Sequence, residues 1–249
     1  MKENSTFIKI NELIGKDAYR LCFEVDWPSY NPGQFVMISI SGKEVFLRRP
    51  FSIAGLSQGL AEICYKVVGK GTRALALAPA GIRIDVAGPF GKGFEMPDSK
   101  NTLVLVAGGY GIAPFVGLCR KIGKGAVIYY GAKSISEFLY LDELEKMKVK
   151  VVFSTEDGSK GHKGMITQVL ERDLNAIKNP ALISSGPKGL LEAIAKMGLS
   201  KDIPTQVSME EYMACGMGVC NGCVCKGKDG EFLKTCSDGP VFRAEELKW

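Results

Sequence analysis

The sequence is short of several features that would point to particular kinds of protein. Its 249 residues include a single histidine, His162, which stands far in sequence from the cysteines near the C-terminus and so disfavours a mixed cysteine and histidine zinc site. No apolar run approaches the roughly 18 residues that a membrane-spanning helix needs, so we expect no membrane partner. The first residues, Met1–Thr6, contain no apolar segment typical of an export signal. We therefore expect a cytoplasmic protein, and we interpret His162 as a loop residue.

The charge and the cysteine content further limit the range of possible functions. The net charge of +5 comes from lysines scattered along the chain, which disfavours nucleic-acid binding. The chain has eight cysteines and no export signal, and in a reducing compartment thiols either bind metals or lie buried. Cys22, Cys64 and Cys119 stand in apolar contexts that are typical of a core. A chain of 249 residues suits about two domains.

Five of the eight cysteines lie near the C-terminus, and four of them have a spacing that points to an inorganic cluster. They follow the pattern C-x4-C-x2-C, then twelve residues and a fourth cysteine: Cys215, Cys220, Cys223 and Cys236. This is the plant-type ferredoxin spacing, in which four thiolates hold a 2Fe-2S cluster. A loop that aims its N–H groups at sulfur needs positive φ angles, which glycine adopts without a clash. We expect such angles at the glycines of this segment, Gly216, Gly218 and Gly222.

Two alternatives stay open for this segment. A structural zinc site is one, although it usually shows paired C-x2-C units or includes histidine. The other concerns the ligand set, because Cys225 is a fifth thiol close to Cys223. We prefer Cys223 as the ligand, since it completes the spacing, and interpret Cys225 as a packed neighbour.

The first part of the chain predicts an antiparallel β barrel or sandwich. Short apolar or alternating runs are separated by Pro and Gly, at 7–10, 20–25, 35–38 and 62–68. Within them, Arg49-Pro50-Phe51-Ser52 alternates a cation, a ring and a hydroxyl along one strand. Gly69-Lys70-Gly71-Thr72 precedes a helix-forming run, and a glycine loop that opens a helix is a natural seat for a pyrophosphate.

From Asn101 onward the pattern changes to alternating strands and helices. Strands are expected at 102–107, 126–130, 149–155, 181–185 and 205–208, and helices at 115–122, 136–146, 165–171 and 188–197. Ser134 and Glu137 form a candidate capping box for the second helix. Such alternation predicts a doubly wound parallel sheet whose ligands bind beyond the carboxyl ends of the strands. The loop 108–114 lies there, and its glycines, Gly108, Gly109 and Gly111, allow a dinucleotide to approach closely or simply make a tight turn.

With these segments in order, the chain resembles the ferredoxin reductase superfamily with a C-terminal iron-sulfur extension. It is most similar to the electron-transfer subunits of class 1B dihydroorotate dehydrogenases. The resemblance covers nearly the whole chain and is carried by 49–52, 69–72, 108–111 and the tail from Glu210 to Phe242. It implies a β barrel for FAD over 1–98, an α/β pyridine-nucleotide domain over 99–209 and a 2Fe-2S segment over 210–249.

The resemblance also implies roles for individual residues. FAD would lie on the barrel against Arg49, Pro50, Phe51, Ser52, Cys64, Tyr65, Lys66, Gly71 and Thr72. NAD would enter over Gly108, Gly109 and Gly111 as a substrate. The cluster would sit on Cys215, Cys220, Cys223 and Cys236, facing an FMN-containing dihydroorotate dehydrogenase subunit. The family implies an assembly with two copies of each subunit and a role in pyrimidine biosynthesis. No residue of this chain is expected to act as a catalytic acid or base.

Several positions depart from the family pattern, all on the nicotinamide side. Ser185 replaces a frequent cysteine, Tyr110 a small or aliphatic residue, and Gly189-Leu190 a frequent Pro-Met pair. The choice between NAD and NADP stays open, because Lys133 is suited to a 2′-phosphate whereas Glu156 and Asp157 would reject one. Two other functions also stay open. One is a reductase subunit of a hydrogenase, sulfur-reducing or transhydrogenase complex, and the other is a zinc-stabilised nucleotide-binding module.

Overall fold

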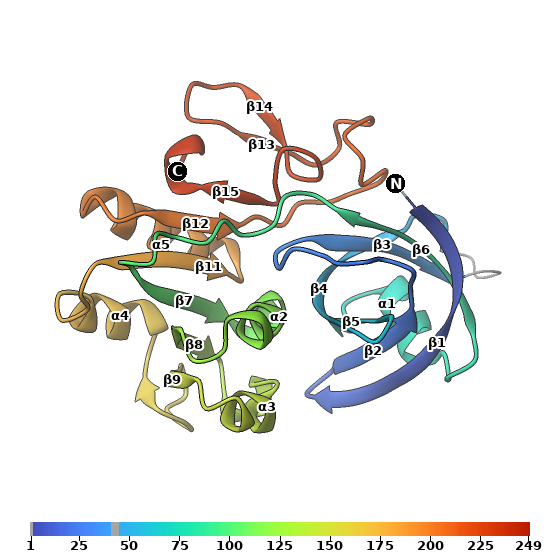
Figure 1. Ribbon diagram of the computed structural model, residues 1–249, viewed down its shortest axis with the longest axis horizontal. Coiled ribbons are helices and arrows are strands. Elements are labelled where there is room, and N and C mark those ends of the chain that lie inside the picture. The colour runs from blue at the N-terminus through green and yellow to red at the C-terminus, as the bar shows by residue number, and fades with distance from the viewer. Residues whose placement is uncertain (1, 41–44) are drawn as a thin grey trace.

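A computed structural model describes residues 2–40 and 45–249. Its first part is a closed antiparallel barrel with the strand order β1-β2-β5-β4-β3-β6 (Figure 1). The strands are β1 (Lys2–Gly15), β2 (Ala18–Glu24), β3 (Phe35–Ile40), β4 (Arg49–Ser57), β5 (Leu60–Lys66) and β6 (Arg83–Phe90). One short helix, α1 (Lys70–Ala76), follows β5. The predicted barrel is confirmed.

The barrel closes around side chains that alternate along its strands. Leu21, Phe23, Ile53, Ile63 and Ile84 are fully buried and belong to one apolar cluster. In a strand, residues two apart share a face, so Leu21 with Phe23 on β2 and the residues paired with them on β5 point inward together. This packing fixes which residues of β4 and β5 face outward, toward the second domain.

The second part of the chain is an α/β domain built on a seven-stranded sheet. The order is β10-β9-β8-β7-β11-β12-β15, in which β15 alone runs antiparallel to its neighbour. The strands are β7 (Thr102–Gly108), β8 (Ala126–Ala132), β9 (Lys150–Thr155), β10 (His162–Lys163), β11 (Pro180–Ser185), β12 (Thr205–Ser208) and β15 (Val241–Arg243). The helices are α2 (Ala113–Ile122), α3 (Leu141–Lys146), α4 (Ile166–Leu174) and α5 (Lys188–Ser200).

Helices cover both faces of this sheet, as predicted. On one face Phe115 of α2 and Leu144 of α3 pack with the strand residues Leu105 and Ile128. On the other face α4 and α5 pack against Val104, Val106 and other strand residues. The alternating side chains of β7 therefore contribute to two separate cores, which explains its continuous apolar run.

Three local predictions in this domain are wrong: one continuous helix over 136–146, its capping box and the loop position of His162. The helix expected over 136–146 is divided into a 3₁₀ turn, η2 (Ile135–Glu137), and α3, and the Ser134 side chain makes no capping hydrogen bond. The reason lies between them, where Phe138 and Leu139 are buried and Tyr140 adopts the left-handed region at φ 59°. The Tyr130 hydroxyl accepts a hydrogen bond from the Leu139 N–H at 3.0 Å, which fixes the interruption. His162 lies in the short edge strand β10 rather than in a loop.

The C-terminal segment lies across both domains at the top of the view in Figure 1. It contains a hairpin of β13 (Val224–Lys226) and β14 (Phe232–Lys234), the strand β15 and a 3₁₀ turn, η3 (Ala244–Glu246). Its backbone is tied to the barrel by Lys92 N–H to Gly239 O at 2.6 Å, and to the nucleotide domain by Met209 N–H to Pro240 O at 2.8 Å. The cysteine segment is thus positioned by both domains at once.

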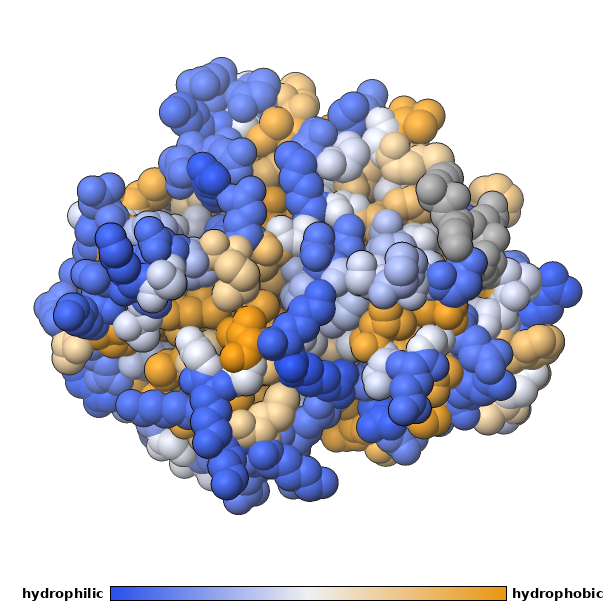
Figure 2. All heavy atoms as spheres, viewed as in Figure 1, coloured by the Kyte–Doolittle hydropathy of each residue, from blue (hydrophilic) through white to orange (hydrophobic). Residues whose placement is uncertain are grey.

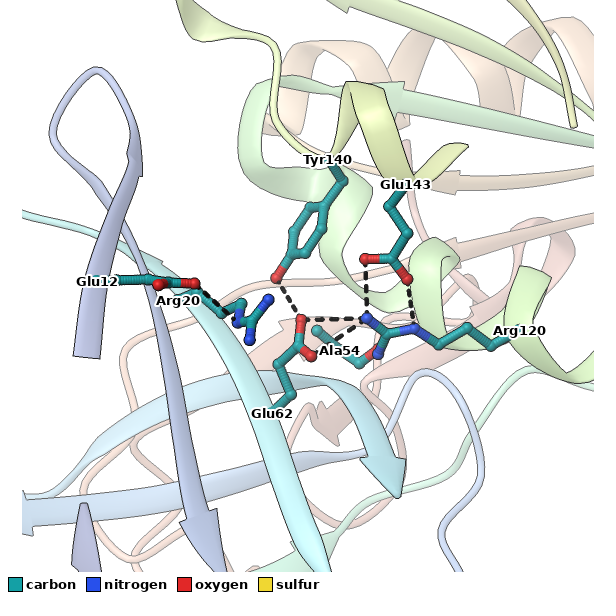
Figure 3. Close-up of polar contacts among 7 residues, drawn as sticks. All are labelled: Glu12, Arg20, Ala54, Glu62, Arg120, Tyr140 and Glu143. Carbon is teal, nitrogen blue, oxygen red and sulfur yellow. Dashed lines mark hydrogen bonds and ion pairs between the residues drawn. The ribbon is translucent and has the colours of Figure 1, made fainter. Parts of the chain in front are cut away.

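A polar network joins the barrel to the α/β domain on another side (Figure 3). Arg120 of α2 makes two hydrogen bonds to Glu143 of α3, at 2.6 and 2.9 Å, and an ion pair with Glu62 of β5 at 3.2 Å. The Tyr140 hydroxyl donates to Glu62 at 2.9 Å, and Arg120 also donates to the Ala54 carbonyl of β4 at 3.2 Å. One arginine therefore holds two strands of the barrel against two helices.

The spread of polar side chains over the surface agrees with the scattered charges of the sequence (Figure 2). In the face shown in Figure 2, hydrophilic side chains are spread over the molecule rather than gathered in one patch. Within the described ranges no helix has the length and hydropathy to span a bilayer.

Candidate functional site

A cleft of about 250 Å³ opens where the barrel, the loop after β7 and the start of the C-terminal segment meet. The structure brings most of the predicted flavin-side residues to its wall: Arg49, Pro50, Phe51, Ser52, Cys64, Tyr65, Lys66 and Thr72. Residues from the second domain and the tail complete it: Tyr110, Gly111, Ala113, Pro114, Ser185, Ser208, Met209, Glu210, Glu211, Met213 and Pro240. We call this space the flavin cleft.

Arg49 and Gly71 are brought into direct contact, although they are 22 residues apart in sequence. A Cβ atom placed on Gly71 would lie 2.3 Å from the Arg49 Nε, so a side chain at this position would force the guanidinium to move. Arg49 also donates to the Leu47 carbonyl. Gly71 lies beside the flavin cleft rather than in its wall. The glycine serves close approach, since its φ is not positive.

Thr72 organises the turn that leads into α1. Its hydroxyl accepts hydrogen bonds from the N–H groups of Val68 and Gly69, at 2.9 and 3.1 Å, and donates to the Gly69 carbonyl at 3.2 Å. The side chain is buried. Thr72 therefore shapes the loop at the cleft, and its one hydroxyl proton already has an acceptor.

The residues of β5 split between the two sides of the barrel wall. The Tyr65 ring points into the barrel, where it stacks on Tyr19 at 5.5 Å and donates to Asn11 Oδ1 at 3.0 Å. Tyr65 also lines the cleft, although it is only 2% exposed. Cys64 belongs to the cluster packed against the second domain, and burial raises the pKa of its thiol to about 12. The Cys64 side chain is thus a neutral part of the cleft wall at physiological pH.

A second cleft of about 450 Å³ lies beyond the carboxyl ends of β7, β8 and β9. Its lining includes Lys16, Lys66, Gly108, Gly109, Tyr110, Lys133, Glu137, Glu156, Pro187 and Gly189. Parallel sheets of this kind bind ligands at this edge. We call it the nucleotide cleft.

Glycine is needed for different reasons at the three glycine positions of the loop after β7. A Cβ on Gly108 would lie 2.8 Å from Pro187 Cδ, and one on Gly111 would lie 2.4 Å from the Ser185 carbonyl oxygen. Both allow the loops after β7 and β11 to touch. Gly109 has a φ of +54° and open space around it. The loop therefore needs glycine for packing as well as for any approach of a nucleotide.

Three charged residues are candidates for selecting NAD over NADP or the reverse, and not all of them face the nucleotide cleft. Lys133 and Glu156 line it. Asp157 instead accepts hydrogen bonds from the Ser159 N–H at 2.9 Å and the Ser159 hydroxyl at 2.6 Å, which hold down the pKa of its carboxyl. The Asp157 carboxylate thus stabilises its own turn.

The four predicted cluster ligands differ in exposure. Cys223 and Cys236 are each only 2% exposed, and they pack with Phe35, Met37 and Ala87 of the barrel. Cys215 is half-buried and Cys220 is exposed. The loop therefore presents two thiols toward the barrel and one toward solvent.

Backbone N–H groups of the cysteine loop point at sulfur, as expected for an iron-sulfur site. The Gly218 N–H donates to Cys236 Sγ at 3.1 Å, and the Met217 N–H to Cys215 Sγ at 3.4 Å. Gly216 and Gly218 have the predicted positive φ, at 72° and 82°. The prediction is wrong for Gly222, because the preceding Asn221 carries the left-handed angle at φ 55°.

The thiols also differ in acidity. Desolvation acts to raise the pKa of Cys215, yet hydrogen bonds from nearby N–H groups outweigh it and lower that pKa to about 6. Burial, and then the adjacent Cys223 thiol, raise the pKa of Cys236 to about 12. Four thiolates in one pocket repel one another, so full deprotonation needs a cationic metal centre. The donor set fits an iron-sulfur cluster.

The described residues contain no preformed three-ligand metal site. Among residues 2–40 and 45–249, no three side chains of His, Cys, Asp or Glu are grouped as they would be around one metal ion. A 2Fe-2S cluster divides its four thiolates between two irons, so three ligands need not meet at one point.

Cys225, the fifth thiol, lies in a different environment. It packs with Leu233 and Trp249 in the cluster under the hairpin, and its Sγ lies 3.6 Å from the Leu233 carbonyl oxygen. Cys223, by contrast, shares its pocket with Cys236. This separation supports Cys223 over Cys225 as the ligand.

Two side chains belong to both the flavin cleft and the cysteine pocket. Phe35 and Met213 line the cleft and also pack with Cys223 and Cys236. Met213, Glu210 and Glu211 also line the cleft, although the sequence patterns alone do not mark them as cleft residues. Their position directly after the strand β12, at the carboxyl edge of the sheet, was the signal available for them.

Comparisons with known proteins agree with this geometry. Residues 210–248 match the family model of the iron-sulfur cluster binding domain of dihydroorotate dehydrogenase B, and residues 105–196 match the oxidoreductase NAD-binding domain. The dihydroorotate dehydrogenase B (NAD(+)) electron transfer subunit of Caldanaerobacter subterraneus subsp. tengcongensis is 37% identical over 95% of each chain. The corresponding subunit of Clostridium acetobutylicum is 35% identical over 99% of this chain and 98% of the relative.

A solved structure of similar fold covers both domains and the tail. It is that of an NADH-dependent reduced ferredoxin-NADP oxidoreductase, with a TM-score of 0.85 and 28% identity over 98% of this chain and 90% of the other. Together with the two family models, it supports the expected set of a 2Fe-2S cluster, FAD and NAD. The chain is an NAD-linked oxidoreductase subunit and belongs to the family of dihydroorotate dehydrogenase B electron transfer subunits.

Proposed function

We propose that this chain carries electrons between an FMN-containing dihydroorotate dehydrogenase subunit and NAD, in pyrimidine biosynthesis. A 2Fe-2S cluster in the cysteine pocket and FAD in the flavin cleft would be its carriers. When bound, a flavin exchanges electron pairs with a nicotinamide and single electrons with an iron-sulfur centre. The observation that carries the proposal is the shared wall of Phe35 and Met213, which places the flavin cleft and the cysteine pocket back to back.

The flavin-side residues have complementary tasks in this proposal. Arg49, held against Gly71, supplies a guanidinium for the pyrophosphate, because paired N–H groups match phosphate oxygens. Ser52 and Tyr65 would line the flavin ring, and Thr72 keeps the adjoining loop in shape. The domain limits of 1–98, 99–209 and 210–249 remain part of this proposal.

The nucleotide cleft would bind NAD across the β7 loop. Gly109, with open space at its Cβ position, would let the dinucleotide lie close to the backbone, while Gly108 and Gly111 would keep the loop packed against the loop after β11. Glu156 in the lining favours NAD, because a carboxylate repels the 2′-phosphate of NADP. Lys133 in the same lining favours the opposite choice, so its exchange for glutamate should strengthen any preference for NAD.

The partner would dock where a cluster thiol reaches the surface. Cys220 is exposed, and around it in sequence stand exposed apolar side chains, with Tyr212 94% and Val219 75% accessible. Exposed aromatic and aliphatic side chains beside a redox group are typical of an interface. We propose the dihydroorotate dehydrogenase catalytic subunit as the occupant, in an assembly of two copies of each chain within the cytoplasm.

A second candidate is a reductase subunit of a different electron-transfer complex. The 28% identity to the NADH-dependent reduced ferredoxin-NADP oxidoreductase over 98% of this chain favours it, since that protein of similar fold is named for ferredoxin and NADP rather than for dihydroorotate. The two candidates share the flavin and nucleotide clefts and differ only in what docks near Cys220.

Co-purification followed by assay separates the candidates. The tagged chain should retain an FMN-containing subunit, and the complex should reduce NAD+ when dihydroorotate is supplied. A bound partner that does not oxidise dihydroorotate would favour the second candidate. Freshly purified protein with neither flavin nor acid-labile sulfide would refute both.

A further inference from the structure

Lys234 extends from the end of β14 over the cysteine loop. Neighbouring residues of a strand leave opposite faces, and Leu233 packs under the hairpin with Cys225, so the Lys234 side chain leaves the other face. Its Nζ donates a hydrogen bond to the Gly218 carbonyl oxygen at 3.4 Å. Its stem follows the same residue, since a Cβ on Gly218 would lie 3.9 Å from Lys234 Cδ. The ammonium of this half-buried lysine is thus held against the loop that carries the predicted cluster ligands.

Gly218 connects this ammonium to one of the cluster thiols. Its carbonyl oxygen accepts the bond from Lys234, and its N–H donates to Cys236 Sγ at 3.1 Å. Because a single residue spans the two contacts, the Lys234 Nζ lies no more than about 10 Å from the Cys236 sulfur. Charges this far apart near a protein surface interact more strongly than they do in bulk water. The lysine is therefore close enough to act electrostatically on a group held by the four thiols.

The backbone of Lys234 has a separate task, because it fixes the turn that carries Cys236. Its carbonyl oxygen accepts hydrogen bonds from the N–H groups of Ser237 and Asp238, at 3.1 and 2.8 Å. Its N–H donates to the Asp238 carboxylate at 2.7 Å, and the Ser237 hydroxyl donates to the same carboxylate at 3.3 Å. Asp238 is thus a negative charge bound into this turn. A change in the Lys234 side chain leaves these backbone bonds, and the Asp238 charge, in place.

We propose that the Lys234 ammonium raises the reduction potential of a 2Fe-2S cluster held by the four predicted cysteines. The inference rests on the proposed function and assigns Lys234 as a positioning residue, which acts by its charge rather than as a ligand. Uptake of one electron makes the four-thiolate site one charge more negative, and a nearby cation stabilises the more negative form. The site would thus accept an electron more readily, whether the electron comes from a flavin or from a docked partner.

The test measures the cluster potential in wild type, Lys234→Gln, Lys234→Met and Lys234→Arg, each purified without air and loaded with FAD and cluster. The electron paramagnetic resonance signal of the reduced cluster is followed during a mediated titration with dithionite. Loss of the charge should shift the one-electron equilibrium roughly 4- to 16-fold against reduction, which is about 35–70 mV toward lower potential. Lys234→Arg keeps the positive charge and should stay within about twofold of wild type.

Lys226→Gln is the matched control, because Lys226 lies exposed on the other strand of the same hairpin. Solvent and salt screen an exposed charge, so its removal should shift the equilibrium by less than about twofold. Equal shifts in Lys226→Gln and Lys234→Gln would refute the inference, because the net charge of the hairpin rather than the position of Lys234 would then set the potential.

The outcomes separate this inference from the function beneath it. If wild type contains neither iron nor acid-labile sulfide, the proposed function fails and the role of Lys234 fails with it. If wild type shows the cluster signal but Lys234→Gln and Lys234→Met keep its potential, the role of Lys234 alone is refuted. The same conclusion follows if Lys234→Arg shifts as far as Lys234→Gln, or if both neutral variants lose the cluster, because the side chain would then serve shape or assembly rather than charge.

Discussion

At the scale of single residues, the cysteine loop depends on a few backbone angles and N–H groups. Gly216 and Gly218 take left-handed angles that turn the N–H groups of Met217 and Gly218 toward sulfur. A side chain on Gly216 would also lie 2.6 Å from Met37 Cγ, in the barrel. The loop is therefore shaped for its ligands and for its seat on the barrel together.

Removal of the exposed thiol should separate the two redox sites. Cys220→Ala removes one ligand without opening a buried cavity, so we expect the fold to persist while the cluster is lost. Acceptor reduction that passes through the cluster should be lost, whereas bleaching of FAD by NADH should continue. Iron content and visible absorbance measure the loss, and Cys225→Ser is the matched control that should keep full iron. Loss of flavin from Cys220→Ala would show that the tail is required for the flavin cleft.

Arg49 should govern retention of FAD. Arg49→Ala removes a charge-assisted contact with phosphate, which is worth about 1.5–3 kcal/mol, or roughly 10- to 150-fold in the dissociation constant. Flavin released during dialysis measures the effect. Arg73→Ala, on the exposed side of the neighbouring helix α1, should leave the affinity unchanged. Equal flavin loss in the two variants would mean that general positive charge, and not the Arg49 position, retains the cofactor.

At the scale of elements, α2 is the joint between the domains. Its Gly117 has no side chain, and a Cβ there would lie 2.8 Å from the Ala54 carbonyl oxygen of β4, so helix and strand lie in close contact. Three residues further along, Arg120 bonds to that same carbonyl and to Glu62 and Glu143. The register of one helix thus sets how the flavin cleft and nucleotide cleft face each other.

Arg120→Ala should weaken this joint. The change leaves the mostly buried Glu62 carboxylate without its cationic partner, and we expect a loss of about 2–3 kcal/mol in the free energy of unfolding. Urea denaturation measures it. Lys196→Ala breaks an exposed i,i+4 pair with Glu192 and should cost at most about 0.5 kcal/mol. If the two variants lose the same free energy, the network in Figure 3 does not hold the domains together.

The elements also show which features of the fold can be predicted from sequence patterns. Apolar alternation and continuous apolar runs predicted the barrel and the parallel strands, because burial imposes a period on the residues themselves. The cysteine spacing predicted four cluster ligands, and two of them, Cys223 and Cys236, share a buried pocket. The strand β15 and the break before α3 could not be predicted in this way, because β15 has three residues and the break depends on Tyr130, which meets Leu139 only in the folded chain. Tyr65 could not be oriented either, since its direction depends on pairing with β2.

At the scale of the whole molecule, the nucleotide cleft, the flavin cleft and the cysteine pocket adjoin one another in that order. The nucleotide cleft meets the flavin cleft at Tyr110, and the flavin cleft meets the cysteine pocket at Phe35 and Met213. Backbone bonds from the tail to Lys92 and Met209 hold the last of these against both domains. The order of the spaces is the order in which electrons would travel between a nucleotide and a partner docked at Cys220.

The most direct test of this order is anaerobic addition of NADH to the purified chain loaded with FAD and a 2Fe-2S cluster. Flavin absorbance and the electron paramagnetic resonance signal of the reduced cluster are followed in the same sample. We predict that the flavin bleaches and that the cluster signal then appears, without any partner present. A flavin that bleaches while the cluster stays oxidised, although dithionite reduces it, would contradict a path from the flavin cleft to the cysteine pocket.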